Sequence, residues 1–138
     1  MNRSYILGID PGSSKTGAAL LDTCGNIIRL DILWMDDFAK NLTEFLQTAQ
    51  PGTCIIGDGT TSTKLQQTLT EIVPDLEIIV CDEAHSTEEA RNLYWQINPP
   101  QGWRSWMPLG MLTPPVPLDA YAAVVLVRRY LAEIGMTK

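Results

Sequence analysis

Acidic residues follow three apolar segments that have the length of buried strands, and another acid begins the last apolar segment of the chain. These acids are Asp10, Asp58, Glu83 (with its neighbour Asp82) and Asp119. If the three strands are parallel, their carboxyl ends share one edge of a sheet, where open α/β sheets build their sites. Carboxylates held together repel one another, and Mg²⁺ or Mn²⁺ relieves that repulsion. Two such ions can activate a water and stabilise a leaving oxygen, so the pattern favours metal-dependent hydrolysis of phosphodiester bonds.

Each acid also has a simpler explanation, because Asp is common in turns and in the first turn of a helix. That explanation is strongest for Asp119, which the dipole of the last helix would favour. It is weaker for Asp10, since Pro11-Gly12 already supplies the turn after the strand. Several acids placed in the same way at strand ends favour a site over coincidence.

Apolar spacing and turn residues predict the elements that would position these acids. The residues 22–26 are typical of a hairpin turn, and the later strands alternate with helices. We therefore predict an α/β fold with a five-stranded mixed sheet flanked by helices. Residues 98–117 hold six of the nine prolines and two of the four tryptophans, which indicates an irregular loop. We expect strands over 4–10, 16–22, 27–34, 54–58 and 76–81, and helices over 36–49, 61–73, 86–97 and 118–134.

Length and composition limit the possibilities further. The 138 residues, with a hydrophobic fraction of 45%, are typical of a single domain, which we expect to span 1–138. No apolar run is long enough to span a membrane and the first residues lack the layout of a signal peptide, so we expect a cytoplasmic protein with no membrane partner. The net charge of −6 has the wrong sign for a nucleic-acid binder, although acids gathered in a metal site contribute to it.

Two ATP-binding patterns are nearly present. Lys15-Thr16 would end a Walker loop, but Ser14 and Ile9 stand where that loop needs glycine. A strand follows instead of a helix, so no helix N-terminus is available to hold phosphates, and the helicase-like string at 82–85 has no phosphate loop to act with. The phosphate loop of actin and the sugar kinases fits better locally. Those proteins hold ATP between two such domains, however, and the chain has length for one.

Three motifs, in order, resemble a nuclease family. Gly8-Ile9-Asp10-Pro11-Gly12-Ser13 resembles the first strand of RuvC, the Holliday junction resolvase. Asp82-Glu83-Ala84-His85-Ser86-Thr87 resembles the D-E-R-x-[ST]-T segment of the RuvX/YqgF family. Leu118-Asp119-Ala120-x-Ala122-Ala123 resembles the closing helix of that family. Together the motifs and their spacing cover nearly the whole chain apart from residues 98–117.

The resemblance implies an RNase H-like fold and a nuclease that uses Mg²⁺ or Mn²⁺. Carried over by motif, its acids are Asp10, Glu83 and Asp119. The substrate it implies is structured nucleic acid, because RuvX/YqgF proteins are assigned to trimming the small-subunit ribosomal RNA precursor and are often labelled Holliday junction resolvases. We rank structured RNA first and branched DNA second.

The sequence departs from the family in places that leave alternatives open. Ala84 stands where the family has Arg, and residues 115–118 replace basic residues that commonly precede the last Asp. Asp58 stands where RuvC-like enzymes carry an acid, so the second metal ligand is either Asp58 or Glu83. A non-catalytic module that binds nucleic acid or protein is the rival interpretation.

Basic and aromatic residues in segments near the acidic edge are candidates for contact with phosphates and unpaired bases. The two tryptophans among them could instead cover the core or a contact between two copies of the chain in a homodimer. Arg128 and Arg129 are expected only to complement the dipole at the end of the last helix. The candidate contact residues are Lys15, Lys64, Arg91, Trp103, Arg104 and Trp106.

Overall fold

A computed structural model describes residues 5–84, 86–102, 106–108, 114 and 116–135. Its elements follow the predicted order, with most bounds within one or two residues of those expected. Within the described ranges, no helix combines the length and the apolar character that crossing a membrane requires. The strands are β1 (Tyr5–Asp10), β2 (Lys15–Asp22), β3 (Ile27–Trp34), β4 (Thr53–Gly57) and β5 (Glu77–Cys81), and the helices are α1 (Phe38–Phe45), α2 (Ser62–Ile72), α3 (Ser86–Ile97) and α4 (Asp119–Glu133).

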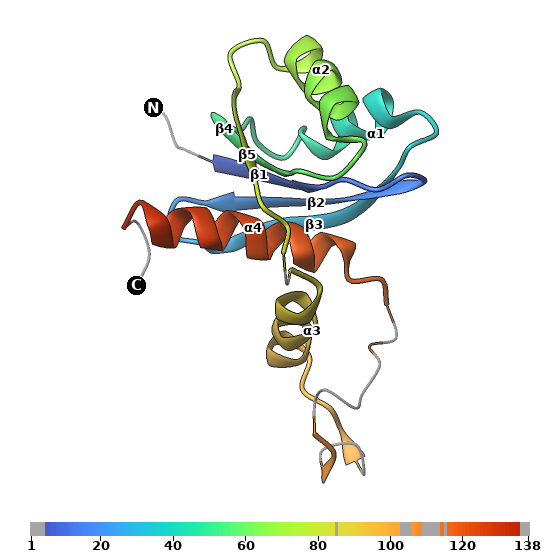
Figure 1. Cartoon of the computed structure of the whole chain (residues 1–138), viewed down its shortest axis with the longest axis vertical. Helices are drawn as coiled ribbons and strands as arrows, with labels where there is room; N and C mark the ends of the chain where they lie inside the picture. Colours follow the sequence, from blue (N-terminus) through green and yellow to red (C-terminus); the bar gives the residue numbers. More distant parts are fainter. Residues whose placement is uncertain (1–4, 85, 103–105, 109–113, 115, 136–138) are drawn as a thin grey trace.

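The five strands form one mixed sheet in the order β3-β2-β1-β4-β5. The first three strands are antiparallel neighbours, while β4 pairs with β1 and β5 with β4 in parallel. Helices α1 and α2 lie on one face of this sheet and α4 lies on the other, with α3 packed against α4 (Figure 1). The predicted five-stranded mixed sheet flanked by helices is therefore confirmed.

Side chains on the central strands alternate between the two faces, as the period of a strand requires. On β1, Leu7 and Ile9 join the core beneath α1 and α2, whereas Ile6 joins the core beneath α4. Both cores exclude water from β1, which explains its nearly continuous apolar sequence. Asp10, the last residue of β1, is therefore an acid at the end of a buried apolar strand.

Two glycines allow α4 to lie directly on the sheet. Gly8 of β1 and Gly17 of β2 both face this helix. A Cβ on Gly8 would overlap the carbonyl oxygen of Ala123, and a Cβ on Gly17 would overlap the backbone of Asp119. The obstacles are all backbone atoms at Gly17 and include backbone atoms at Gly8, so side-chain rotation alone could not make room. The close approach brings the N-terminus of α4 to the strand edge that carries Asp10.

Helix α1 is shorter than the predicted 36–49. Asp37 has a left-handed backbone with φ 62°, and the helix ends at Phe45. The apolar spacing continues beyond this end, because Leu46 is buried and Ala49 packs on the same core without being helical. Apolar spacing reports which residues are buried, and here burial extends past the last helical turn.

Candidate active site

The acids that follow the strands meet at one edge of the sheet. Asp10 is the last residue of β1, Asp58 follows β4 directly, and Glu83 lies two residues after the end of β5. These three strands are parallel, and their register pairs Ile9 with Ile56 and Ile56 with Val80. The strands therefore end at nearly the same level, and the polypeptide carries an acid at each exit.

Asp119 reaches the same edge from the opposite direction. It is the first residue of α4, and its backbone lies against Gly17 of β2. Gly17 is the residue that pairs with Asp10 across the β1–β2 ladder. Directly opposed residues in a ladder project to the same face, so Asp10 projects to the face that α4 covers. This geometry brings Asp10 and Asp119 together although 108 intervening residues separate them in sequence.

The electrostatics of Asp10 reflect this crowding. Burial, followed by the charges of Glu83 and Asp119, raises the pKa of Asp10 from its ordinary value of 3.8 to about 7. Each of these causes disfavours the ionised form. The structure thus places Glu83 and Asp119 close enough to act on Asp10, and the three form an acidic cluster that we call the carboxylate edge.

The raised pKa predicts an unusual stability profile in the absence of metal. The folded protein keeps the Asp10 proton up to about pH 7, whereas the unfolded chain loses it near pH 4, so the folded state binds more protons between these values. The free energy of unfolding should therefore fall as the pH rises from 4 to 7, by on the order of 3 kcal/mol from this group. Urea denaturation in EDTA at several pH values measures it.

Two variants isolate the contribution of Asp10 to that profile. Asp10→Asn should lose this part of the decline, because Asn has no proton to release. Asp75→Asn removes an exposed acid from the turn before β5 and retains Asp10, so it should keep the decline. If Asp10→Asn and the wild type show the same profile, Asp10 is not in the crowded environment described here.

Glu83 is held in place by the loop that follows β4. Its Oε2 accepts a hydrogen bond of 2.8 Å from the N–H of Gly59, and its own N–H donates to Oδ1 of Asp58 at 3.4 Å. Burial raises the pKa of Glu83, and the nearby charges of Asp58 and Asp82 add to this, while the Gly59 N–H opposes it. Asp58 is exposed, so it occupies the outer side of this pair of loops.

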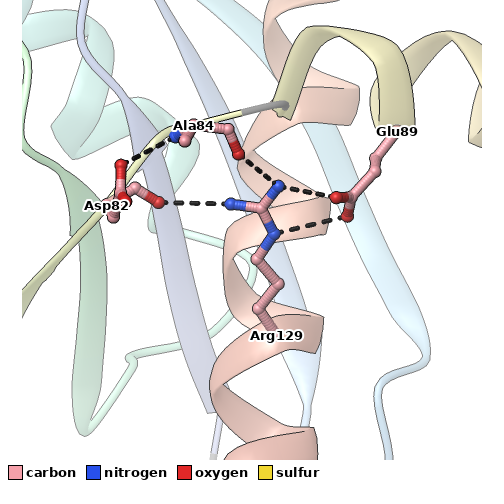
Figure 2. Close-up of polar contacts among 4 residues, drawn as sticks. All are labelled: Asp82, Ala84, Glu89 and Arg129. Atoms are coloured by element: carbon pink, nitrogen blue, oxygen red, sulfur yellow. Dashed lines mark hydrogen bonds and ion pairs between the residues drawn. The ribbon is translucent and has the colours of Figure 1, made fainter.

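Arg129 of α4 fixes the segment that carries Glu83 (Figure 2). Its guanidinium donates to the carbonyl oxygens of Asp82 at 3.2 Å and Ala84 at 2.6 Å, the residues on either side of Glu83. The same group makes a two-point contact with the Glu89 carboxylate of α3, with an ion-pair distance of 2.7 Å. One side chain therefore joins α4, α3 and the loop after β5.

The prediction that Arg128 and Arg129 only complement a helix dipole was wrong. Arg128 donates from Nε and Nη2 to the carbonyl oxygen of Gly25, in the turn of the β2–β3 hairpin. Both arginines thus bind backbone carbonyls of distant segments. No sequence signal marked those partners, because the acceptors are main-chain atoms that every residue has.

The candidate contact residues are distributed unevenly around this edge. Lys15 begins β2, two residues before Gly17, and is half-buried beside the carboxylate edge. Lys64 is exposed in the first turn of α2, on the other face of the sheet, and Arg91 is half-buried on α3. Trp106 is exposed, whereas Trp103 and Arg104 lie outside the described residues.

The carboxylate edge is not a ready-made metal cage. Among the residues that the structure describes, no three or more His, Cys, Asp or Glu side chains are arranged to hold an ion. A groove of about 450 Å³ lies between α3 and α4, and none of the four candidate acids lines it. The chemistry available at the edge is therefore that of converging carboxylates at the sheet surface.

Comparison with known proteins gives a match in structure only. No protein-family model matches the chain, and no curated protein matches it in sequence. It is similar to RuvC of Thermus thermophilus, with a TM-score of 0.62 and 11% identity over 95% of this chain and 96% of that one. It is also similar to T. thermophilus RuvC in complex with a Holliday junction substrate, with a TM-score of 0.59 and 13% identity over 96% of each chain. These likenesses confirm the predicted RNase H-like fold.

Proposed function

We propose that the chain is a metal-dependent endonuclease that hydrolyses phosphodiester bonds in branched DNA. The observation that carries the proposal is the crowding of Asp10 by Glu83 and Asp119 at the carboxyl edge of the central strand. Such crowding is costly without a cation, and perturbed carboxylates cluster at functional sites. The choice of DNA is supported by the fold match to RuvC in complex with a Holliday junction substrate, which covers 96% of both chains.

The residues at the edge fit Mg²⁺ or Mn²⁺ by the chemistry of their donors. All are carboxylates, the hard oxygen donors that these ions prefer. Mg²⁺ commonly takes only one or two protein carboxylates and completes its shell with water and phosphate oxygens, so a closed cage is not required. Asp10, Glu83 and Asp119 would hold the metal, with Asp58 as the alternative to Glu83. When bound, the ions would activate a water and stabilise the leaving oxygen of the phosphodiester.

The protein's own residues would prepare the site for that reaction. The Gly59 N–H and Arg129 hold Glu83 and its loop, so little reorganisation of this acid is needed. Asp119 is fixed by the contact of its backbone with Gly17. Lys15, on the strand beside Asp10, is a point charge suited to a DNA phosphate. Each of these contacts positions a group before substrate arrives.

A second substrate, the ribosomal RNA precursor, is favoured by the order of sequence motifs. The segments at 82–87 and 118–123 resemble the corresponding segments of RuvX/YqgF proteins. Membership of that family, and with it RNA trimming in the cytoplasm, is part of this second proposal.

A non-catalytic binding module is favoured by the net charge of −6 and by Ala84 in place of the family's Arg.

The test is cleavage of labelled substrates by the purified protein. A four-way DNA junction, a linear duplex and a ribosomal RNA precursor fragment are incubated with Mg²⁺, Mn²⁺ or EDTA. We expect metal-dependent cuts in the junction and none in EDTA. Cuts in the RNA alone would favour the second proposal. Binding without cleavage of any substrate in either metal would favour the non-catalytic module.

A further inference from the structure

An exposed tryptophan lies on the same sheet edge as the carboxylate edge. Trp34 is the last residue of β3, and 57% of its surface is accessible to solvent. Large aromatic side chains gain by burial, and an exposed ring that has a cation beside it is suited to contact a ligand. Neither the proposed metal site nor the core on either face of the sheet uses this side chain.

Strand register places Trp34 on the same face as Asp10. Trp34 is directly opposite Lys15 in the β2–β3 ladder, and Gly17, two residues along β2, is opposite Asp10. Opposed residues share a face, and so do residues two apart on one strand. Two strand spacings and two residue rises put the Cα atoms of Trp34 and Asp10 about 12 Å apart, within reach of one bound nucleic-acid strand.

Helix α4 does not extend over this position. Its first residue, Asp119, lies against Gly17, and Lys15 and Trp34 lie two residues further toward the edge. The Lys15 ammonium lies 6.0 Å from the centre of the Trp34 ring, at the outer range of a cation–π contact. A cation and an aromatic ring therefore stand together beside the acids.

The backbone around Trp34 is held firmly. Its carbonyl oxygen accepts a hydrogen bond of 3.1 Å from Nδ2 of Asn41, and the next residue, Met35, donates its N–H to the carbonyl of Ser14 at 2.9 Å. The hydroxyl of Thr16 also lies 3.2 Å from the Met35 sulfur. With the backbone fixed, the conformational freedom lost when a ligand stacks on the ring is limited to the side-chain torsions of Trp34.

We propose that Trp34 stacks on an unpaired base of branched DNA, with Lys15 binding an adjacent phosphate, so that the strand is aligned with the carboxylate edge. This inference rests on the proposed function, because it concerns the substrate of that same site. Aromatic rings stack on bases of any sequence, and a neighbouring cation neutralises the backbone. Trp34 would thus select DNA with unpaired bases near the scissile phosphate over fully paired duplex.

Binding measurements test the stacking separately from cleavage. The variants are made in the Asp10→Asn background, so that bound DNA is not cut, and titrated against a three-way DNA junction with unpaired nucleotides at its branch point. Trp34→Ala should weaken this binding roughly ten-fold, while Trp34→Phe should retain most of it. Neither should change binding to a fully paired duplex of equal length. Ile28→Ala, on the other end of β3 and 43% exposed, is the matched control and should bind like its parent.

Two further measurements separate the role of Trp34 from that of Lys15. A 2-aminopurine at the unpaired position should lose fluorescence on binding, and lose much less with Trp34→Ala. Lys15→Ala should weaken binding to junction and duplex alike and reduce the dependence of log K on log salt by about one.

Several outcomes would overturn the inference. If Trp34→Ala binds the junction as tightly as its parent, the stacking inference is wrong. The proposed function would still hold if the protein with Asp10 intact shows metal-dependent cleavage. An effect of Trp34 confined to RNA of the same sequence would overturn the choice of DNA. Failure of the protein to bind or cut any of these nucleic acids would instead remove the proposed function, and the inference with it.

Discussion

Replacing Asp10 by Asn is expected to reduce metal-dependent cleavage by roughly a hundredfold or more, because a bound metal contributes several kcal/mol to the transition state and each 1.36 kcal/mol is worth a factor of ten. Asn keeps the size of the side chain and removes its negative charge. The charges of both Glu83 and Asp119 act on Asp10, so its loss should weaken the binding of any ion held at the carboxylate edge. Cleavage of the four-way junction in Mn²⁺ measures the effect.

Thermal melting shows whether that loss comes from the site or from the fold. At neutral pH without metal, Asp10→Asn should be at least as stable as the wild type, because it removes a crowded charge. Added Mn²⁺ should raise the melting temperature of the wild type but not of the variant, since an ion bound to the native state stabilises by mass action. A variant that is strongly destabilised, with no Mn²⁺ effect on either protein, would identify Asp10 as a structural turn residue.

Gly17→Ala is expected to destabilise the protein by about 1–3 kcal/mol, the usual cost of forcing an extra group into a packed interior. The added methyl would overlap the backbone of Asp119, so the first turn of α4 must move. Because Asp119 belongs to the carboxylate edge, the cleavage rate of the folded protein should also fall. A displacement of Asp119 by 1 Å would lower it roughly a hundredfold. Urea denaturation measures the loss of stability. The junction assay, run at a temperature well below the unfolding midpoint of the variant, measures the loss of cleavage separately.

Gly52→Ala provides the matched control. It is the same substitution in the residue before β4, where an added Cβ meets nothing within 4 Å. It should leave stability unchanged or slightly raised, because Ala restricts the unfolded chain more than Gly does, and it should leave cleavage unchanged. If Gly17→Ala behaved like Gly52→Ala, the close packing of α4 on β2 would not be what positions Asp119.

Local signals in the sequence were enough to predict most of the fold. The strand at 5–10 and the hairpin strands are bounded by Pro, Gly and Asn residues that end strands for steric reasons, and Gly25 takes the positive φ of 90° that the hairpin turn requires. The parallel pairing of β1, β4 and β5 followed from helical crossovers between strands. The predicted range of helix α1 was too long because buried apolar residues continue past its last turn.

The candidate site was predicted less completely, since it depends on tertiary packing. The sequence indicated which acids end strands, but Arg129 could not be anticipated, because its acceptors are the carbonyls of Asp82 and Ala84. Counting outward from the turn at 22–26 would place Leu33 opposite Lys15. Only the register shift between Leu20 and Leu21 brings Trp34 there, so this pairing could not be predicted from the turn. Asp119 comes close to Asp10 because of the direction in which α4 lies on the sheet. That direction depends on the packing at Gly17, which local sequence patterns do not predict.

The contacts of Arg129 have a consequence for local unfolding. The Arg129 guanidinium, carried by α4, binds both Glu89 of α3 and the loop at 82–84 that holds Glu83, so separating α3 from α4 removes the Glu89 contacts that orient this guanidinium toward the loop. Residues that share such a side chain tend to open as a cooperative unit, with a common free energy of opening. The amide hydrogens of α3 and of the loop after β5 should therefore exchange with solvent together. The position of Glu83 thus depends on the stability of α3, although α3 carries none of the four candidate acids. A partner that stabilised or loosened α3 would be expected to change any cleavage at the carboxylate edge.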